Sequence, residues 1–174
     1  YSFEKVMYQE NDGIIWKPWE TTPQVSLAME MVNSEVARSG GDAAGLDGLA
    51  GRLKWNYTTG LELKAMLDVW ESRGCSDEAL YAYVESWYDR IIDEDGNILT
   101  YDIKKYNIDH ICPGRTLFQL YAHSGKAKYK KAMDLLMRQL QEHPRTSEGS
   151  FWHKKVYPSQ MWLDGLYMAQ PFYA

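Results

Sequence analysis

The sequence predicts an all-α protein built from helical hairpins that repeat about every fifty residues. Apolar residues recur at helical spacing along most of the 174 residues. Gly60, Gly114 and Gly165 lie in the first turns of alternate predicted helices, 54 and 51 residues apart. Each is followed three positions later by an apolar residue: Leu63, Leu117 and Met168. A repeat of this length with a helix pair as its unit predicts an α/α toroid or solenoid.

The first predicted helix follows an N-terminal arm at residues 1–20. The arm has a mixed, irregular composition, and Asp12-Gly13 is typical of a turn. The helix is expected over residues 23–38, because Thr22 suits a cap and Pro23 suits the first helical position. Its apolar stripe is Val25, Met29, Val32 and Val36. The Gly-rich and Ala-rich stretch that ends at residue 51 predicts a loop.

The second and third helices are expected at residues 54–73 and 76–93. The second carries an apolar stripe and stops at Gly74. The third starts at Ser76, and the acidic residues that follow suit the helix dipole. Beyond it, the sequence predicts a hairpin-type turn at residues 95–97 and a short strand at residues 98–102. The stripe of the second helix is Leu63, Met66, Leu67 and Trp70, and that of the third is Leu80, Tyr83, Val84, Trp87, Tyr88 and Ile91.

Three further helices complete the pattern, at residues 107–125, at 128–142 and from Trp162 onward. The fifth turns Lys, Arg and Gln outward, and a loop at 144–160 leads to the sixth. The second, fourth and sixth helices carry unusual polar and aromatic residues at their N-terminal ends. We therefore expect these three to form the inner layer, with their motifs meeting at one end of the structure.

Composition restricts the possible functions. A net charge of −5 and a pI near 5.4 argue against nucleic acid as a partner. No apolar run reaches the length of a membrane span, so no membrane is expected. Cys75 and Cys112, and four scattered histidines, show no metal-ligand spacing, so neither a metal nor another cofactor is expected. Aromatic residues make up 14% of the chain, which favours ligands with flat apolar faces, such as sugars.

The segment 151–168 has the strongest functional signal. It combines four aromatic residues before the last helix with His153, Lys154 and Lys155, and it places Asp164 beside Trp162 in the first turn. Aromatic walls next to a carboxyl group and cationic donors are what a sugar site with an acid catalyst requires. The alternative is that Asp164 is only a helix cap, His153 a structural histidine and the lysines solvated.

Asp109 is the second candidate carboxylate. It lies 55 residues before Asp164, at the equivalent place in the repeat, so the two side chains can converge on one ligand. Together with Trp55, Tyr57, His153 and Trp162, the pair favours a carbohydrate site over a pair of helix caps. A structure with the two carboxylates at opposite ends of the helices would exclude a shared site.

Several motifs resemble the unsaturated rhamnogalacturonyl hydrolases, which form glycoside hydrolase family 105 within the six-hairpin glycosidases. The resemblance extends from about Val25 to the last residue, and the run at 161–168 is its most specific part. It is carried by Lys54-Trp55-Asn56-Tyr57-Thr58-Thr59-Gly60, Ile108-Asp109 with Gly114, Pro144-Arg145-Thr146, Phe151-Trp152-His153-Lys154, Tyr157-Pro158 and Met161-Trp162-Leu163-Asp164-Gly165-Leu166-Tyr167-Met168. It implies an (α/α)6 barrel, of which residues 21–174 would form the N-terminal half.

The resemblance also implies a chemistry. Family members remove Δ4,5-unsaturated galacturonic acid from the non-reducing end of pectin fragments by protonating C4 of the enol ether while water adds at C5. Asp164 matches the proton donor, held protonated by burial against Trp162, and Asp109 matches the second carboxylate. The residues that match sugar contacts are Asn56, Tyr57, His153, Lys154 and Tyr157, beside the aromatic walls of Trp55 and Trp162.

Three alternatives remain open at this point. The chain could be a non-catalytic carbohydrate-binding or scaffold module, an unsaturated glucuronyl hydrolase, or an inverting glycosidase acting on saturated glycans. Because family members have about twice this length, we expect a C-terminal segment or a second chain to complete the barrel. The sequence leaves the leaving sugar and the cellular compartment open.

Overall fold

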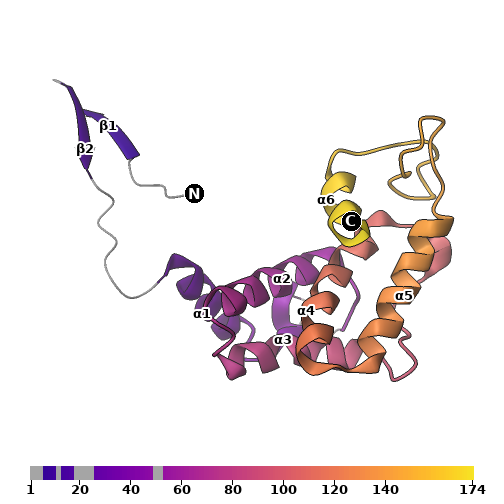
Figure 1. Cartoon of the computed structure of the whole chain (residues 1–174), viewed down its shortest axis with the longest axis horizontal. Helices are drawn as coiled ribbons and strands as arrows, with labels where there is room; N and C mark the ends of the chain where they lie inside the picture. Colours follow the sequence, from indigo (N-terminus) through magenta and orange to yellow (C-terminus); the bar gives the residue numbers. More distant parts are fainter. Residues whose placement is uncertain (1–5, 11–12, 18–25, 49–52) are drawn as a thin grey trace.

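The computed structural model describes residues 6–10, 13–17, 26–48 and 53–174. For residues 6–10, 13–17 and 47–48 it describes the backbone alone. Its body is helical, which confirms the predicted class (Figure 1). The α-helices are α1 (Leu27–Arg38), α2 (Tyr57–Ser72), α3 (Glu78–Ile91), α4 (Arg115–Ser124), α5 (Ala127–Glu142) and α6 (Asp164–Tyr173). Short 3-10 helices are η1 (Ala43–Gly48), η2 (Ile103–Lys105) and η3 (Ile108–Gly114).

The N-terminal arm contains a strand pair, so the expectation of an irregular segment is wrong there. Strand β1 (Val6–Glu10) pairs antiparallel with β2 (Gly13–Lys17), with Val6 opposite Lys17 and Glu10 opposite Gly13. Both segments are rich in β-branched and aromatic residues, which favour strands. The predicted turn at Asp12-Gly13 lies partly outside the described residues, and Gly13 is the first residue of β2.

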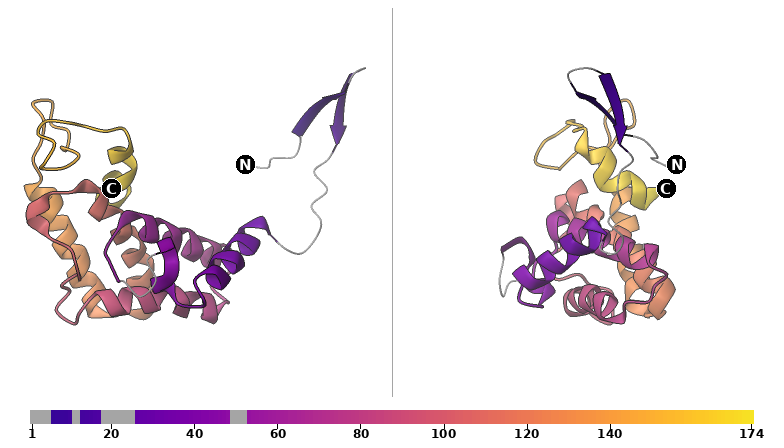
Figure 2. Two further views of the ribbon diagram at one scale, coloured as in Figure 1. Left: turned by 180° about the vertical axis from the view of Figure 1, so that it is seen from behind. Right: turned by 90° about the vertical axis from the view of Figure 1, so that its left-hand side faces the viewer.

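The helices form successive hairpins, with α2, α4 and α6 as neighbouring inner helices (Figure 2). Helix α2 packs on α4 and on η3, and η3 packs on α6. The outer helix α3 lies against α2, and α5 lies against α4. This order confirms the alternation of inner and outer helices that the repeat predicted.

The helix starts follow local capping chemistry. Ser26, Asn56 and Asp77 each accept a hydrogen bond from a backbone N–H in the first turn of the next helix. Helix α1 therefore begins at Leu27 rather than at residue 23. Thr22 and Pro23, the predicted cap and first helical position, lie outside the described residues.

Two predicted elements change character between α3 and α4. Residues 98–102 do not form a strand, because only a single bridge pairs Ile92 with Ile98. Asp93 accepts hydrogen bonds from the backbone of Asp95 and Asn97, which fixes the turn without a ladder. The predicted helix at 107–125 divides into η3 and α4, since Pro113 lacks the N–H that a continuous α-helix requires.

Two of the three repeating glycines, Gly60 and Gly114, lie at close junctions between neighbouring units. A Cβ on Gly60 would lie 2.5 Å from Cβ of Pro113, at the end of η3. A Cβ on Gly114 would lie 2.5 Å from Leu136 of α5 and 2.9 Å from the Phe172 ring of α6. At both junctions glycine permits a contact that any larger residue would block.

The core beneath these junctions is continuous and aromatic. Trp55 stacks on Trp87 with ring centroids 5.7 Å apart, and Tyr88 meets both rings edge-on. All three are almost fully buried. Within the described residues, no helix combines the length and apolar character that crossing a membrane requires.

Candidate active site

Asp109 lies on η3, and two hydrogen bonds fix the position of this segment. The Asn107 side chain caps η3 by accepting a hydrogen bond of 3.0 Å from the Asp109 backbone N–H. The Trp55 indole N–H donates to the carbonyl of His110 at 2.7 Å, which anchors the segment to the core. Asp109 itself is 7% exposed. The fold therefore holds this carboxylate rigidly and nearly out of solvent.

The loop at 144–160 brings two cationic side chains to Asp109. The His153 carbonyl accepts from the backbone N–H of Ile108, and the His153 N–H donates to the carbonyl of Gln160. Lys154 then forms a bridge with Asn107. This short backbone pairing places Lys154 Nζ 2.8 Å from Oδ2 of Asp109 and His153 Nε2 3.5 Å from its Oδ1.

The hydrogen bonding around Asp109 is incomplete. Oδ1 of Asp109 makes no hydrogen bond within the described part of the chain. Its distance of 3.5 Å from His153 Nε2 is too long for a good hydrogen bond. The Nδ1 atom of His153 also has no partner there, although the ring is 98% buried, with 2% exposure. Buried polar atoms normally find partners, and exceptions gather at functional sites.

Asp164 completes the carboxylate pair. It is the first residue of α6, and one of its oxygens lies within 4.8 Å of ligand atoms of both Asp109 and His153. The two carboxylates therefore converge at one end of the inner helices, as the repeat predicted. Asp164 is exposed, however, so the expectation that it is buried against Trp162 is wrong for this structure.

An aromatic stack forms the wall of the site. The Trp162 ring lies 4.1 Å from the His153 ring and 5.3 Å from the Tyr157 ring, nearly parallel to each. Trp162 is 41% exposed and Tyr157 37% exposed. Lys154 Nζ lies 5.9 Å from the centre of the Trp162 ring. The stack gives Trp162 a fixed orientation and leaves an aromatic surface beside the carboxylates.

In the motif at the start of α2, some side chains hold the local structure together and others lie at the surface. Trp55 is 1% exposed, so the expectation that its ring forms a sugar-binding wall is wrong: its hydrogen bond supports η3 instead. The Asn56 side chain is bound to the backbone of Lys54 and to Thr59, as a helix cap. Of the three predicted sugar contacts in this motif, Trp55, Asn56 and Tyr57, the Tyr57 side chain is the most exposed, at 39%.

The sequence analysis missed a buried polar network behind the loop. It assigned the glutamines of α5 to the outer face, but Gln139 is fully buried. Its amide donates to the Asn107 carbonyl and to His143 Nδ1, and His143 Nε2 donates to the carbonyl of Trp152. Burial lowers the pKa of His143, which favours the neutral ring that this pattern needs. The only sequence feature that indicates burial of Gln139 is its position three residues after Leu136, on the apolar face of the helix.

Asp109, His153 and Asp164 also have the spacing of a cation site, since one ligand atom from each lies within 4.8 Å of the others. Carboxylate and imidazole are common metal ligands. The Lys154 ammonium already neutralises Asp109 at 2.8 Å, and a metal ion would have to compete with it. The geometry fits acid–base chemistry on an uncharged or anionic ligand better than metal binding.

Comparison with known proteins assigns the family. The profile of Glycosyl Hydrolase Family 88 matches residues 28–174. The chain therefore belongs to the glycoside hydrolases of family 88/105 and has a partial six-hairpin glycosidase fold. A solved structure described as a glycoside hydrolase from family 105 of C. acetobutylicum ATCC 824 is 36% identical, with a TM-score of 0.74 over 86% of this chain. The match spans 38% of that protein.

Proposed function

We propose that this protein takes part in removing Δ4,5-unsaturated galacturonic acid from the non-reducing end of rhamnogalacturonan oligosaccharides. The convergence of Asp109 and Asp164 at the Trp162 stack, beside Lys154, carries the proposal. Membership of family 88/105 supports the reaction class. The uronate carboxylate of such a substrate would give the cationic side chains a ligand of opposite charge.

The two carboxylates have different environments and hence different roles. Asp164 is exposed at the start of α6 and can meet the sugar, so it protonates C4 of the enol ether. Asp109 is buried and paired with Lys154, and it serves as the hydrogen-bond acceptor for the water that adds at C5. The resulting hemiketal opens and releases the next sugar. The proton leaves Asp164 and is returned from the added water.

The separation of the carboxylates argues against an inverting glycosidase. Such enzymes keep their two carboxyl groups roughly 6.5–9.5 Å apart, with a water between one of them and the sugar. Here oxygens of Asp109 and Asp164 come within 4.8 Å. Addition of water to a double bond that one carboxylic acid has protonated does not require the larger gap.

Loss of ultraviolet absorbance from the unsaturated uronide tests the proposal. The purified protein should consume rhamnogalacturonan-derived unsaturated disaccharides, and Asp164→Asn should reduce turnover by roughly 10²–10⁴-fold, because an amide cannot supply the proton. Asp134→Asn, on the exposed face of α5, is the matched control and should leave turnover unchanged. Binding without consumption of the double bond would support the binding-module alternative. Preference for an unsaturated glucuronide would reassign the substrate.

A further inference from the structure

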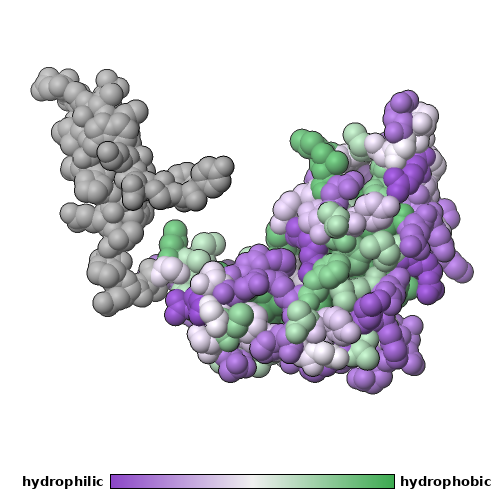
Figure 3. All heavy atoms as spheres, in the orientation of Figure 1, coloured by the Kyte–Doolittle hydropathy of each residue, from purple (hydrophilic) through white to green (hydrophobic). Residues whose placement is uncertain are grey.

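A group of buried polar side chains lies behind the candidate active site, at the end of α5. Gln139 is fully buried on α5, and His143, which caps the C-terminal end of that helix, is 3% exposed. The outward surface of α5 is mostly hydrophilic (right-hand side of Figure 3), and Gln141 is exposed there. Burying a polar side chain costs free energy unless it finds hydrogen-bond partners. We call Gln139, His143 and Tyr101, which bonds to Gln139, the buried network.

The buried network uses every polar atom of its side chains. The Tyr101 hydroxyl donates to Oε1 of Gln139 at 2.6 Å. The Gln139 amide donates to the Asn107 carbonyl at 3.0 Å and, more weakly, to His143 Nδ1 at 3.4 Å. His143 Nε2 donates to the carbonyl of Trp152 at 2.8 Å. These partners select one orientation of the amide and one tautomer of the ring.

The two carbonyl acceptors belong to the two segments that form the site. Asn107 caps η3 and lies two residues before Asp109, while Trp152 lies two residues before Lys154. The same two segments make the short backbone pairing that contains the bridge between Asn107 and Lys154. That pairing places Lys154 Nζ 2.8 Å from Oδ2 of Asp109. The buried network therefore holds both sides of the pairing from the core.

We propose that Gln139 and His143 are positioning residues, which set the place of Lys154 relative to Asp109 by binding the Asn107 and Trp152 carbonyls. The proposal rests on the function proposed above. Neither side chain is placed among the groups that would meet the sugar, so each acts through the backbone that it holds. Misplacing a group in an active site by about 1 Å can lower turnover roughly 10²-fold.

The buried network differs from the site that it supports. All its side-chain polar atoms have partners, whereas Asp109 Oδ1 and His153 Nδ1 make no hydrogen bond within the described residues. The rings of Tyr106 and Phe151 meet His143 edge-on, with centroids 5.7 Å and 5.4 Å away, which restricts the imidazole further. A rigid, fully bonded support beneath a site with free acceptors is what preorganisation of a catalytic site requires.

Amide hydrogen exchange of the whole protein tests the proposal without a substrate. His143→Phe removes the donor to Trp152 but keeps a ring of similar size. Exchange should become at least roughly tenfold faster at the amides of Ile108 and Lys155, which donate across the pairing to the other segment, and should stay unchanged in α2 and α3. Unchanged exchange at these two amides, or a uniform increase in all helices, would overturn the proposal.

Three further variants control the exchange experiment. His143→Gln should restore slow exchange, because its amide can accept from Gln139 and donate to the Trp152 carbonyl. Gln139→Met removes the donor to the Asn107 carbonyl and should give the same local pattern as His143→Phe, which keeps the test decisive if that variant does not fold. Gln141→Leu, on the exposed side of the same helix, is the matched control and should exchange like wild type.

A double-mutant cycle on turnover separates positioning from stability. His143→Phe should lower kcat on the unsaturated disaccharide roughly tenfold in the wild-type background. In the Lys154→Met background the loss should be less than about twofold, because no ammonium group remains to be misplaced. Equal losses in both backgrounds would show a purely structural role and overturn the proposal. A wild type that leaves the disaccharide intact would instead contradict the proposed function, and the exchange result alone would then decide whether the buried network holds the pairing.

Discussion

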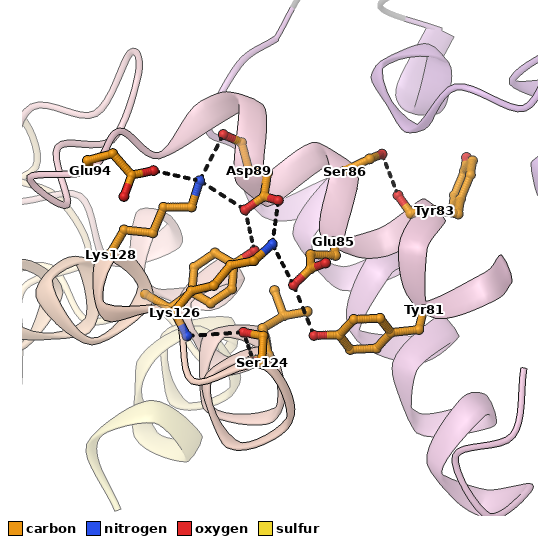
Figure 4. Close-up of polar contacts among 11 residues, drawn as sticks. Tyr81, Tyr83, Glu85, Ser86, Asp89, Glu94, Ser124, Lys126 and Lys128 are labelled. Atoms are coloured by element: carbon orange, nitrogen blue, oxygen red, sulfur yellow. Dashed lines mark hydrogen bonds and ion pairs between the residues drawn. The ribbon is translucent and has the colours of Figure 1, made fainter. Parts of the chain in front are cut away.

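Two buried or half-buried aspartates of this chain lie beside lysines, and their surroundings differ. The carboxylate of Asp89 on α3 pairs with Lys126 at 2.6 Å and with Lys128 at 2.9 Å (Figure 4). The Tyr129 hydroxyl also donates a hydrogen bond to it, at 2.7 Å. Both of its oxygens have partners. Asp109 has Lys154 on one oxygen and no hydrogen bond within the described residues on the other.

The difference separates a structural carboxylate from a functional one. The cluster at Asp89 links α3 to the turn between α4 and α5, and Lys126 also reaches Glu85 (Figure 4). Burial alone would raise the pKa of Asp89, but hydrogen bonds from Lys126, Tyr129 and Lys128 outweigh it and lower the pKa. Such a satisfied network adds stability and leaves nothing for a ligand. The incomplete network at Asp109 leaves an acceptor for water or a sugar hydroxyl.

The largest effect predicted from this comparison concerns turnover. Asp109→Asn should lower turnover on the unsaturated disaccharide roughly 10²-fold, because the amide no longer holds the added water in position. Its melting temperature should change little, since the network was incomplete. The Asp89→Asn variant should keep wild-type turnover per folded molecule. Equal losses of activity in both variants would contradict the division of roles.

The sequence predicted the helical repeat and the convergence of Asp109 with Asp164, because both follow from periodicity. It could not predict that Trp55 would be buried. A tryptophan before a helix looks the same whether it faces a ligand or, as here, donates to the His110 carbonyl within the core. Nor could it show which oxygens of Asp89 and Asp109 have partners, since the lysines that pair with them lie far along the chain and meet them only through tertiary packing.

The second prediction concerns stability. Asp89→Asn should lower the melting temperature by a few degrees, because charged hydrogen bonds of a partly exposed cluster contribute about 1 kcal/mol after solvent screening. Lys130, which pairs with Asp134 on the surface of α5, supplies the matched control. Lys130→Met should shift melting much less in the same thermal scan. A larger shift at Lys130 would show that the Asp89 cluster is not the stronger of the two.

The third prediction is a smaller dependence of stability on pH. Burial lowers the pKa of His143, so the unfolded chain binds a proton more readily than the folded one. The contribution of the neutral ring is complete above the unfolded pKa of about 6.5 and is lost as the pH falls through the lower folded value. Melting temperature should therefore decrease between about pH 7 and pH 5. The lowered pKa of Asp89 adds a further loss only below about pH 4.

His143→Gln tests the origin of that dependence. Its amide can still donate to the Trp152 carbonyl but cannot take up a proton. The variant should have a flatter melting profile between about pH 7 and pH 5 than wild type. Burial also lowers the pKa of His110, so part of the slope should remain. A slope that His143→Gln leaves unchanged would assign the effect to His110 or to other groups.

The smallest expected effect is that of a metal chelator. Asp109, His153 and Asp164 have the spacing of a cation site, but a cation at Asp109 would have to displace the Lys154 ammonium at 2.8 Å. The proposed reaction takes its proton from Asp164 and needs no Lewis acid. Turnover should therefore be the same before and after dialysis against EDTA, and after addition of Mg²⁺, Ca²⁺ or Zn²⁺. Activity lost in EDTA and restored by one of these ions would show that the unsatisfied oxygen of Asp109 holds a metal rather than water. In that case Lys154→Met should tighten metal binding, measured by calorimetry, because it removes the competing charge.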